Sequence, residues 1–105
     1  MIEIAKIFMD DCPLCRSVSQ RLFIMERDHT NLRILDFNWE RFTDDEKEYY
    51  TGLGVTRVPF LIYLTLDKDN PAVQADQLIL TGFTPNKLKE QIEKVSGEKL
   101  IENDS

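Results

Sequence analysis

Cysteine and histidine, the residues that most often hold zinc, are scarce in this chain. Its 105 residues include two cysteines, Cys12 and Cys15, and one histidine, His29. Two cysteines cannot build a framework of several disulfides or a four-cysteine metal site, and a tetrahedral site usually takes four protein ligands. We therefore expect no metal ion and no other cofactor, and the cysteine pair needs an explanation of its own.

Clustered basic residues and long apolar runs are also absent from the sequence. The formal net charge is -6, which disfavours binding to nucleic acid or to an anionic membrane. Residues 2–9 carry charges of both signs within a short run, which is typical of neither a signal peptide nor a membrane span. We expect a cytoplasmic monomer, and in the cytoplasm a C-x-x-C motif is more often catalytic or metal-binding than structural.

The length and composition indicate one domain. With 105 residues and 42% hydrophobic content, the chain can bury a core without disulfide bonds. No internal repeat or low-complexity segment divides it. We expect the domain to span residues 1–97 and to be followed by a frayed tail, residues 98–105.

The run Cys12-Pro13-Leu14-Cys15 is the most informative motif. Pro13 suits the first position of a helix, because its φ is fixed and its missing N–H is not needed there. The cysteines would then lie one turn apart, with Cα atoms roughly 5 Å from each other, within the range that a disulfide spans. Backbone N–H groups and the helix dipole would stabilise a thiolate at Cys12. We predict a redox-active pair in which Cys12 is the nucleophile and Cys15 the resolving thiol.

Charged neighbours modify this prediction. Asp10 and Asp11 place negative charge beside the Cys12 sulfur, and Arg16 opposes them in part. Like charge disfavours the thiolate. We expect Cys12 to be only moderately activated by its surroundings.

The first half of the chain is predicted to alternate strand, helix and strand. Residues 2–9 are rich in β-branched and apolar side chains, which is typical of a buried strand. Apolar residues recur at helical spacing from Pro13 to about Arg27. After a polar break, residues 32–37 form a second predicted strand, which should lie parallel to the first because a helix connects them.

Two further helices are predicted from their end residues. Thr43-Asp44-Asp45-Glu46 has the form of a capping box, and Gly52 is placed to end that helix. Thr84-Pro85 is an N-cap followed by a proline at the first helical position, and Gly97 is placed to end the last helix.

Residues 58–66 and 77–81 are predicted to form an antiparallel hairpin across a polar loop. The resulting order, β-α-β-α-β-β-α with C-x-x-C at the first strand–helix junction, resembles that of the thioredoxin/glutaredoxin superfamily. The resemblance is carried by Cys12-Pro13-Leu14-Cys15, by the run Gly54-Val55-Thr56-Arg57-Val58-Pro59-Phe60 and by Leu80-Thr81-Gly82-Phe83. It implies an α/β, thioredoxin-like fold: a four-stranded mixed sheet flanked by three helices.

The resemblance also implies a substrate-binding site. The Val58–Pro59 peptide bond would be cis and would pack beside the two sulfurs, so that backbone groups of Val58 can pair with an extended substrate. Gly82 would allow a bound chain or the proline loop to approach closely. Arg57 is the candidate for binding a glutathione carboxylate.

The chain departs from both branches of the superfamily. Thioredoxins carry a tryptophan before the first cysteine and a buried aspartate six residues upstream of it, whereas this chain has Asp11 and Lys6 at these places. Its Cys-Pro-x-Cys motif and small core resemble glutaredoxins, which usually place a lysine shortly before the first cysteine. This chain has Met9-Asp10-Asp11 there.

The resemblance implies a thiol–disulfide oxidoreductase that reduces disulfides in protein substrates and is itself reduced by a thioredoxin reductase or by glutathione. We favour a protein substrate because two acids beside the sulfur would repel anionic glutathione. A glutathione-dependent glutaredoxin and a non-catalytic thioredoxin-like binding module remain the alternatives. The aromatic residues Trp39, Phe42, Tyr49 and Tyr50 are expected to serve packing alone.

Overall fold

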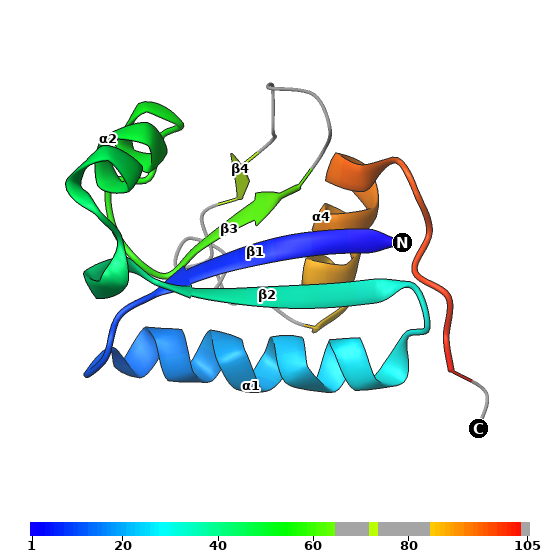
Figure 1. Cartoon of the computed structure of the whole chain (residues 1–105). Coiled ribbons are helices and arrows are strands. Elements are labelled where there is room, and N and C mark those ends of the chain that lie inside the picture. The colour runs from blue at the N-terminus through cyan, green and yellow to red at the C-terminus, as the bar shows by residue number, and fades with distance from the viewer. Residues whose placement is uncertain (65–71, 74–84, 104–105) are drawn as a thin grey trace.

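A computed structural model describes residues 1–64, 72–73 and 85–103 of the chain (Figure 1). Strands and helices alternate through most of it, as the sequence predicted. The elements are β1 (Ile2–Phe8), α1 (Pro13–Asp28), β2 (Leu32–Asn38), the short 3-10 helix η1 (Trp39–Arg41), α2 (Asp44–Gly52), β3 (Phe60–Tyr63), β4 (Ala72–Val73) and α4 (Pro85–Ser96).

The sheet is mixed, with the strand order β2-β1-β3-β4. β1 pairs with β2 in parallel over its whole length, from Ile2 opposite Leu32 to Phe8 opposite Asn38. The predicted β-α-β unit is therefore confirmed. On its other side β1 pairs with β3 in the antiparallel direction, so β1 is a central strand and buries apolar side chains on both faces.

The two faces of the sheet contact different helices. Ile2 and Ile4 of β1 belong to a core cluster that includes residues of α1 and α4. Ala5 and Ile7, which alternate with them, belong to a second cluster with residues that surround α2. Because successive side chains of a strand point to opposite faces, α1 and α4 pack on one face, and the residues of the second cluster, which include Tyr50 of α2, pack on the other. Figure 1 shows α2 near the end of the sheet at which β1 leaves for α1.

The predicted four-stranded sheet is not reproduced in its fourth strand. Three strands of four to seven residues carry the sheet. Among the described residues, the strand beside β3 is the two-residue β4, which pairs with Leu61 and Ile62. The fourth strand predicted over residues 77–81 lies outside the described residues. Apolar alternation does not reveal where pairing resumes after a loop, since the register of a hairpin depends on the partner strand and the turn.

The predicted helix ends are reproduced closely. Thr43 caps α2 by a full capping box with Glu46, as its sequence indicated. Gly52 is the last residue of α2, and the positive φ of 107° falls two residues later, at Gly54. Gly97 follows α4 with a φ of 70°, a conformation that glycine adopts without steric penalty.

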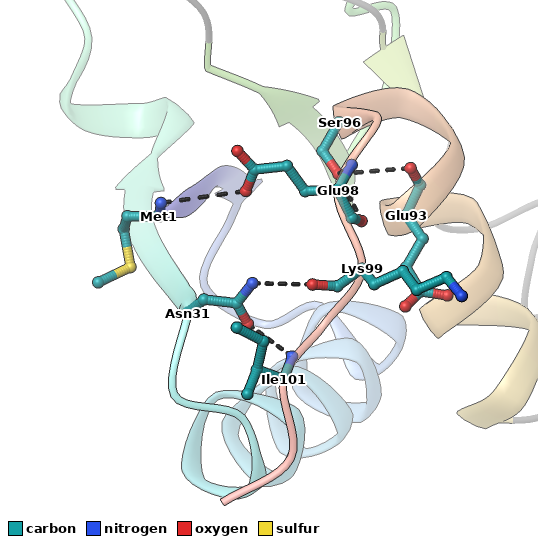
Figure 2. A network of polar contacts seen from close by, with 7 residues as sticks. All are labelled: Met1, Asn31, Glu93, Ser96, Glu98, Lys99 and Ile101. Atoms are coloured by element: carbon teal, nitrogen blue, oxygen red, sulfur yellow. Dashed lines mark hydrogen bonds and ion pairs between the residues drawn. The ribbon is translucent and has the colours of Figure 1, made fainter.

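The segment after α4, for which the sequence predicts a frayed tail, makes hydrogen bonds over residues 98–103 (Figure 2). The side chain of Asn31 donates to the carbonyl of Lys99 at 2.9 Å and accepts from the backbone N–H of Ile101 at 2.8 Å. Leu100 is only 6% exposed, and its N–H donates to the carboxylate of Glu93 at 2.8 Å. A buried leucine and satisfied backbone groups hold this segment against the loop between α1 and β2.

Backbone hydrogen bonds also hold the segment after α4 against the end of α1 and the loop that follows it. Thr30 donates to the carbonyl of Ile101 and Asn103 to that of Asp28, each at 2.8 Å. The amino terminus lies nearby, with the Met1 nitrogen 4.0 Å from a Glu98 carboxylate oxygen (Figure 2). Both of these charged groups are more than half exposed, so this ion pair contributes little. The two ends of the described chain thus meet at one end of the sheet.

Replacing Asn31 by alanine should lower the free energy of unfolding by about 1–2 kcal/mol, because two backbone groups of the tail lose their partner. Urea denaturation measures this change, and faster hydrogen exchange at the Ile101 amide should accompany it. Asn103→Ala, which removes an exposed amide from the same segment, is the control. Equal stability of the two variants would contradict the role given to Asn31.

Candidate active site

The cysteine pair lies where β1 turns into α1. Asp11 has a positive φ of 55° in this turn, Cys12 is the N-cap of α1 and Pro13 is its first residue. The Cα atoms of Cys12 and Cys15 are 5.2 Å apart, and their sulfurs are joined in a disulfide. The predicted proximity of the two sulfurs is confirmed.

The two sulfurs differ in their surroundings. The Cys12 sulfur accepts a hydrogen bond from the Cys15 backbone N–H at 3.1 Å, and the Cys12 side chain is half-buried. Cys15 is 2% exposed and packs on the buried side of α1. A partner molecule can therefore reach Cys12 more readily than Cys15. The backbone N–H that points at Cys12 is the kind of donor that stabilises a thiolate at a helix N-terminus.

The Val58–Pro59 peptide bond is cis, and Pro59 is fully buried. The residue after it, Phe60, pairs with Ile7 of β1, five residues before Cys12. In Figure 1 the segment from α2 into β3 reaches the sheet at the end where β1 leaves for α1. The fold thus brings the proline segment and the cysteine motif to one end of the sheet.

A pocket of about 340 Å³ lies beside this end and has Arg57 and Val58 in its wall. Neither cysteine lines it. Gly82, the remaining predicted substrate-binding residue, lies outside the described residues. The other residues that line the pocket are Met9, Trp39, Thr51, Val55 and Thr56.

Sequence reasoning missed Met9 and Trp39 as pocket residues. Trp39 was expected to serve packing alone, and it does pack edge-on against Phe42 with ring centroids 5.7 Å apart, but it also faces the pocket. Trp39 follows β2 directly, and the end of β2 lies beside the end of β1, which leads to the cysteines. This position in the sequence indicates that Trp39 lies near the site.

The remaining aromatic residues form a packed group. The rings of Phe42 and Tyr50 are stacked with centroids 4.8 Å apart. Burial, and then the neighbouring Tyr49 and Glu46, raise the pKa of Tyr50, so its phenol stays protonated at neutral pH. Tyr49 is 58% exposed, and its ring packs edge-on against Tyr50 with centroids 5.3 Å apart. The expectation of packing is therefore correct for Phe42 and Tyr50, whereas Tyr49 packs while remaining largely exposed.

Lys6 is a third residue that the sequence did not assign to the site. Only 5% of it is exposed. Its ammonium group donates to the hydroxyl of Ser19 at 2.5 Å and pairs with a carboxylate oxygen of Asp36 at 2.9 Å. The Ser19 hydroxyl in turn donates to the carbonyl of Cys15 at 2.8 Å. A buried cation is therefore linked to the cysteine motif by two hydrogen bonds.

Asp10 and Asp11 are both exposed. An amide nitrogen of Asn38 lies 3.5 Å from a carboxylate oxygen of Asp10. Both acids remain in contact with solvent, which screens their effect on the nearby sulfur.

Within the described residues, no group of three or more His, Cys, Asp and Glu side chains could hold a metal ion. None of the helices in this part of the chain is long and apolar enough to cross a bilayer. The chain matches no protein-family model, and no curated protein matches its sequence.

Removing the two acids should increase the reactivity of reduced Cys12. In Asp10→Asn/Asp11→Asn, the rate of alkylation near neutral pH should rise about twofold to fivefold, because less negative charge opposes the thiolate. Mass spectrometry of the iodoacetamide adduct over time measures this rate. Glu48→Gln/Glu90→Gln removes two exposed charges elsewhere and should leave the rate unchanged. An unchanged rate in the first variant would refute the role of the acids.

Proposed function

We propose that this protein is a thioredoxin-like thiol–disulfide oxidoreductase that reduces disulfides in protein substrates through Cys12 and Cys15. The observation that carries the proposal is the bonded cysteine pair at the N-terminus of α1, with Cys12 the more exposed sulfur and Cys15 buried behind it. This asymmetry suits an attacking and a resolving thiol. The mixed sheet, the three helices and the cis bond before Pro59 are compatible with the same type of protein.

In the proposed reaction, the Cys12 thiolate attacks one sulfur of a substrate disulfide. A Cys12–substrate bond forms, the substrate disulfide breaks, and its other sulfur leaves as a thiolate that takes up a proton. Cys15 then loses its proton and attacks Cys12, which releases the second substrate thiol and forms the Cys12–Cys15 disulfide. Two electrons pass from the cysteine pair to the substrate, and a thioredoxin reductase or glutathione returns them. The sulfurs carry the electrons, so the reaction needs no metal or organic cofactor.

The surroundings of Cys12 favour a protein over a small anionic substrate. Asp10 and Asp11 are exposed beside the motif and would repel the carboxylates of glutathione. The pocket that Trp39 and Val58 line offers apolar surface for a substrate side chain. Backbone groups of Val58 would pair with the extended substrate chain.

The proposal is tested by a redox titration and by turnover. In dithiothreitol buffers of graded potential, Cys12 and Cys15 should interconvert between dithiol and disulfide as one two-electron couple, as followed by alkylation and mass spectrometry. The reduced protein should reduce insulin disulfides with a reductase supplying electrons. Cys12→Ser should lower this activity to the rate of the reductant alone. A wild-type protein that shows no couple or no turnover would favour the binding module.

A glutathione-dependent glutaredoxin is the second candidate, because Arg57 lines the pocket beside Val58 and a guanidinium group suits a glutathione carboxylate. Cys15→Ser discriminates the two functions, since removal of glutathione from a mixed disulfide needs only the first cysteine. We expect this variant to lose insulin reduction and to have little deglutathionylation activity. Full activity on a glutathione mixed disulfide would favour the glutaredoxin.

A further inference from the structure

The side chain of Lys6 lies in the layer between the sheet and α1. It alternates with Ala5 and Ile7 along β1 and so faces α1, on the same side as Ile4. A buried ammonium group is costly unless its hydrogen bonds are satisfied. Three contacts satisfy it here: Ser19 at 2.5 Å, Asp36 at 2.9 Å and the ring of Phe8, whose centroid is 5.2 Å away.

The partners of Lys6 differ in charge and in exposure to solvent. The Asp36 side chain is 59% exposed, whereas that of Lys6 is 6% exposed. Water therefore screens the carboxylate more strongly than the ammonium group. Ser19 is neutral. Its hydroxyl accepts from the Lys6 ammonium group and donates to the Cys15 carbonyl at 2.8 Å. The buried member of this ion pair is therefore the ammonium group, and it is two hydrogen bonds from the Cys15 carbonyl.

Other charged groups lie near this layer and around the motif. Glu26 of α1 shares a pocket of about 490 Å³ with Lys6 and Asp36, and accepts from the backbone N–H of Ile34 at 2.6 Å. β3 places Leu61 opposite Lys6, and α4 contributes Leu88 and Ile92 to this core. Around the motif itself, Asp10, Asp11 and Arg16 are exposed.

We propose that Lys6 is a positioning residue that stabilises the thiolate of the reduced cysteine pair, chiefly at buried Cys15, and thereby raises its reduction potential. The inference rests on the proposed oxidoreductase function. An ammonium group near a thiolate favours the ionised form, and stabilising the reduced form of a dithiol makes its disulfide a stronger oxidant. In the resolving step, the same charge assists Cys15 as it loses its proton and attacks Cys12 to release the substrate thiol.

This effect must depend on pH. Below the pH at which a thiol of the pair ionises, both reduced sulfurs are neutral. The charge of Lys6 then has little effect on the reduction potential. Above that pH, the attraction between ammonium and thiolate stabilises the reduced form. A role of Lys6 in packing alone would change the potential equally at low and high pH, or not at all.

The test compares wild type with Lys6→Met, which keeps the length of the side chain and removes its charge. Full chains are equilibrated with dithiothreitol buffers between about pH 5 and pH 8.5, and the dithiol fraction is measured by alkylation and mass spectrometry. At high pH, Lys6→Met should favour the disulfide about tenfold more than wild type, equivalent to about 30 mV for this two-electron couple. At low pH the two proteins should agree within about twofold.

Further variants separate charge from fold. Lys6→Arg keeps the charge and should stay near wild type at every pH, and Lys94→Met removes an exposed lysine of α4 and should do the same. Lys6→Gln serves if Lys6→Met does not fold, as checked by urea denaturation. The proposal is overturned by a neutral variant that matches wild type at high pH, by a shift that is equal at all pH values, or by Lys6→Arg behaving as Lys6→Met. If wild type shows no couple, the proposed function fails as well.

Discussion

The parallel pairing of β1 with β2 is the constraint on which the rest of the structure depends. Two parallel neighbours need a crossover that returns the chain to the starting end of the sheet, and here α1 makes that crossover. The chain must therefore leave β1, turn, and begin a helix within a few residues. Cys12 is the N-cap of that helix, so the position of the motif at one end of the sheet follows from strand pairing.

Strand pairing with β1 also explains how residues from distant segments come to lie near the cysteines. β3 pairs with β1 from the other side and brings Pro59, with Val58 and Arg57 before it, to the end of the sheet that carries the cysteines. β2 places Asp36 opposite Lys6, and α1, packed on that face, supplies Ser19. One face of the sheet thus holds a charged group beneath the motif, while the opposite face holds the aromatic residues around α2.

The opposite end of the sheet is closed by contacts that no local pattern indicates. The amide of Asn31, in the loop that leads into β2, binds two backbone groups of the segment after α4 (Figure 2). Polar, charged residues after a helix-ending glycine are typical of a free tail, and the sequence of this segment fits that type. Leu100 and Ile101 are the exceptions, and Leu100 is buried where α1, β2 and α4 meet.

The sequence determined those features that depend on residues within one or two helical turns. They are the helix starts at Cys12-Pro13 and Thr43, the helix end at Gly97 and the spacing that lets the two sulfurs bond. It also determined the parallel β-α-β unit, because a helical connection permits little else. Only the tertiary structure decided that Lys6 is buried against Ser19 and Asp36, that Trp39 faces a pocket with Val58, and that the tail is held by Asn31. Each of these contacts joins residues that are far apart in the sequence. No single segment therefore predicts them, because they depend on which distant segments pack against each other.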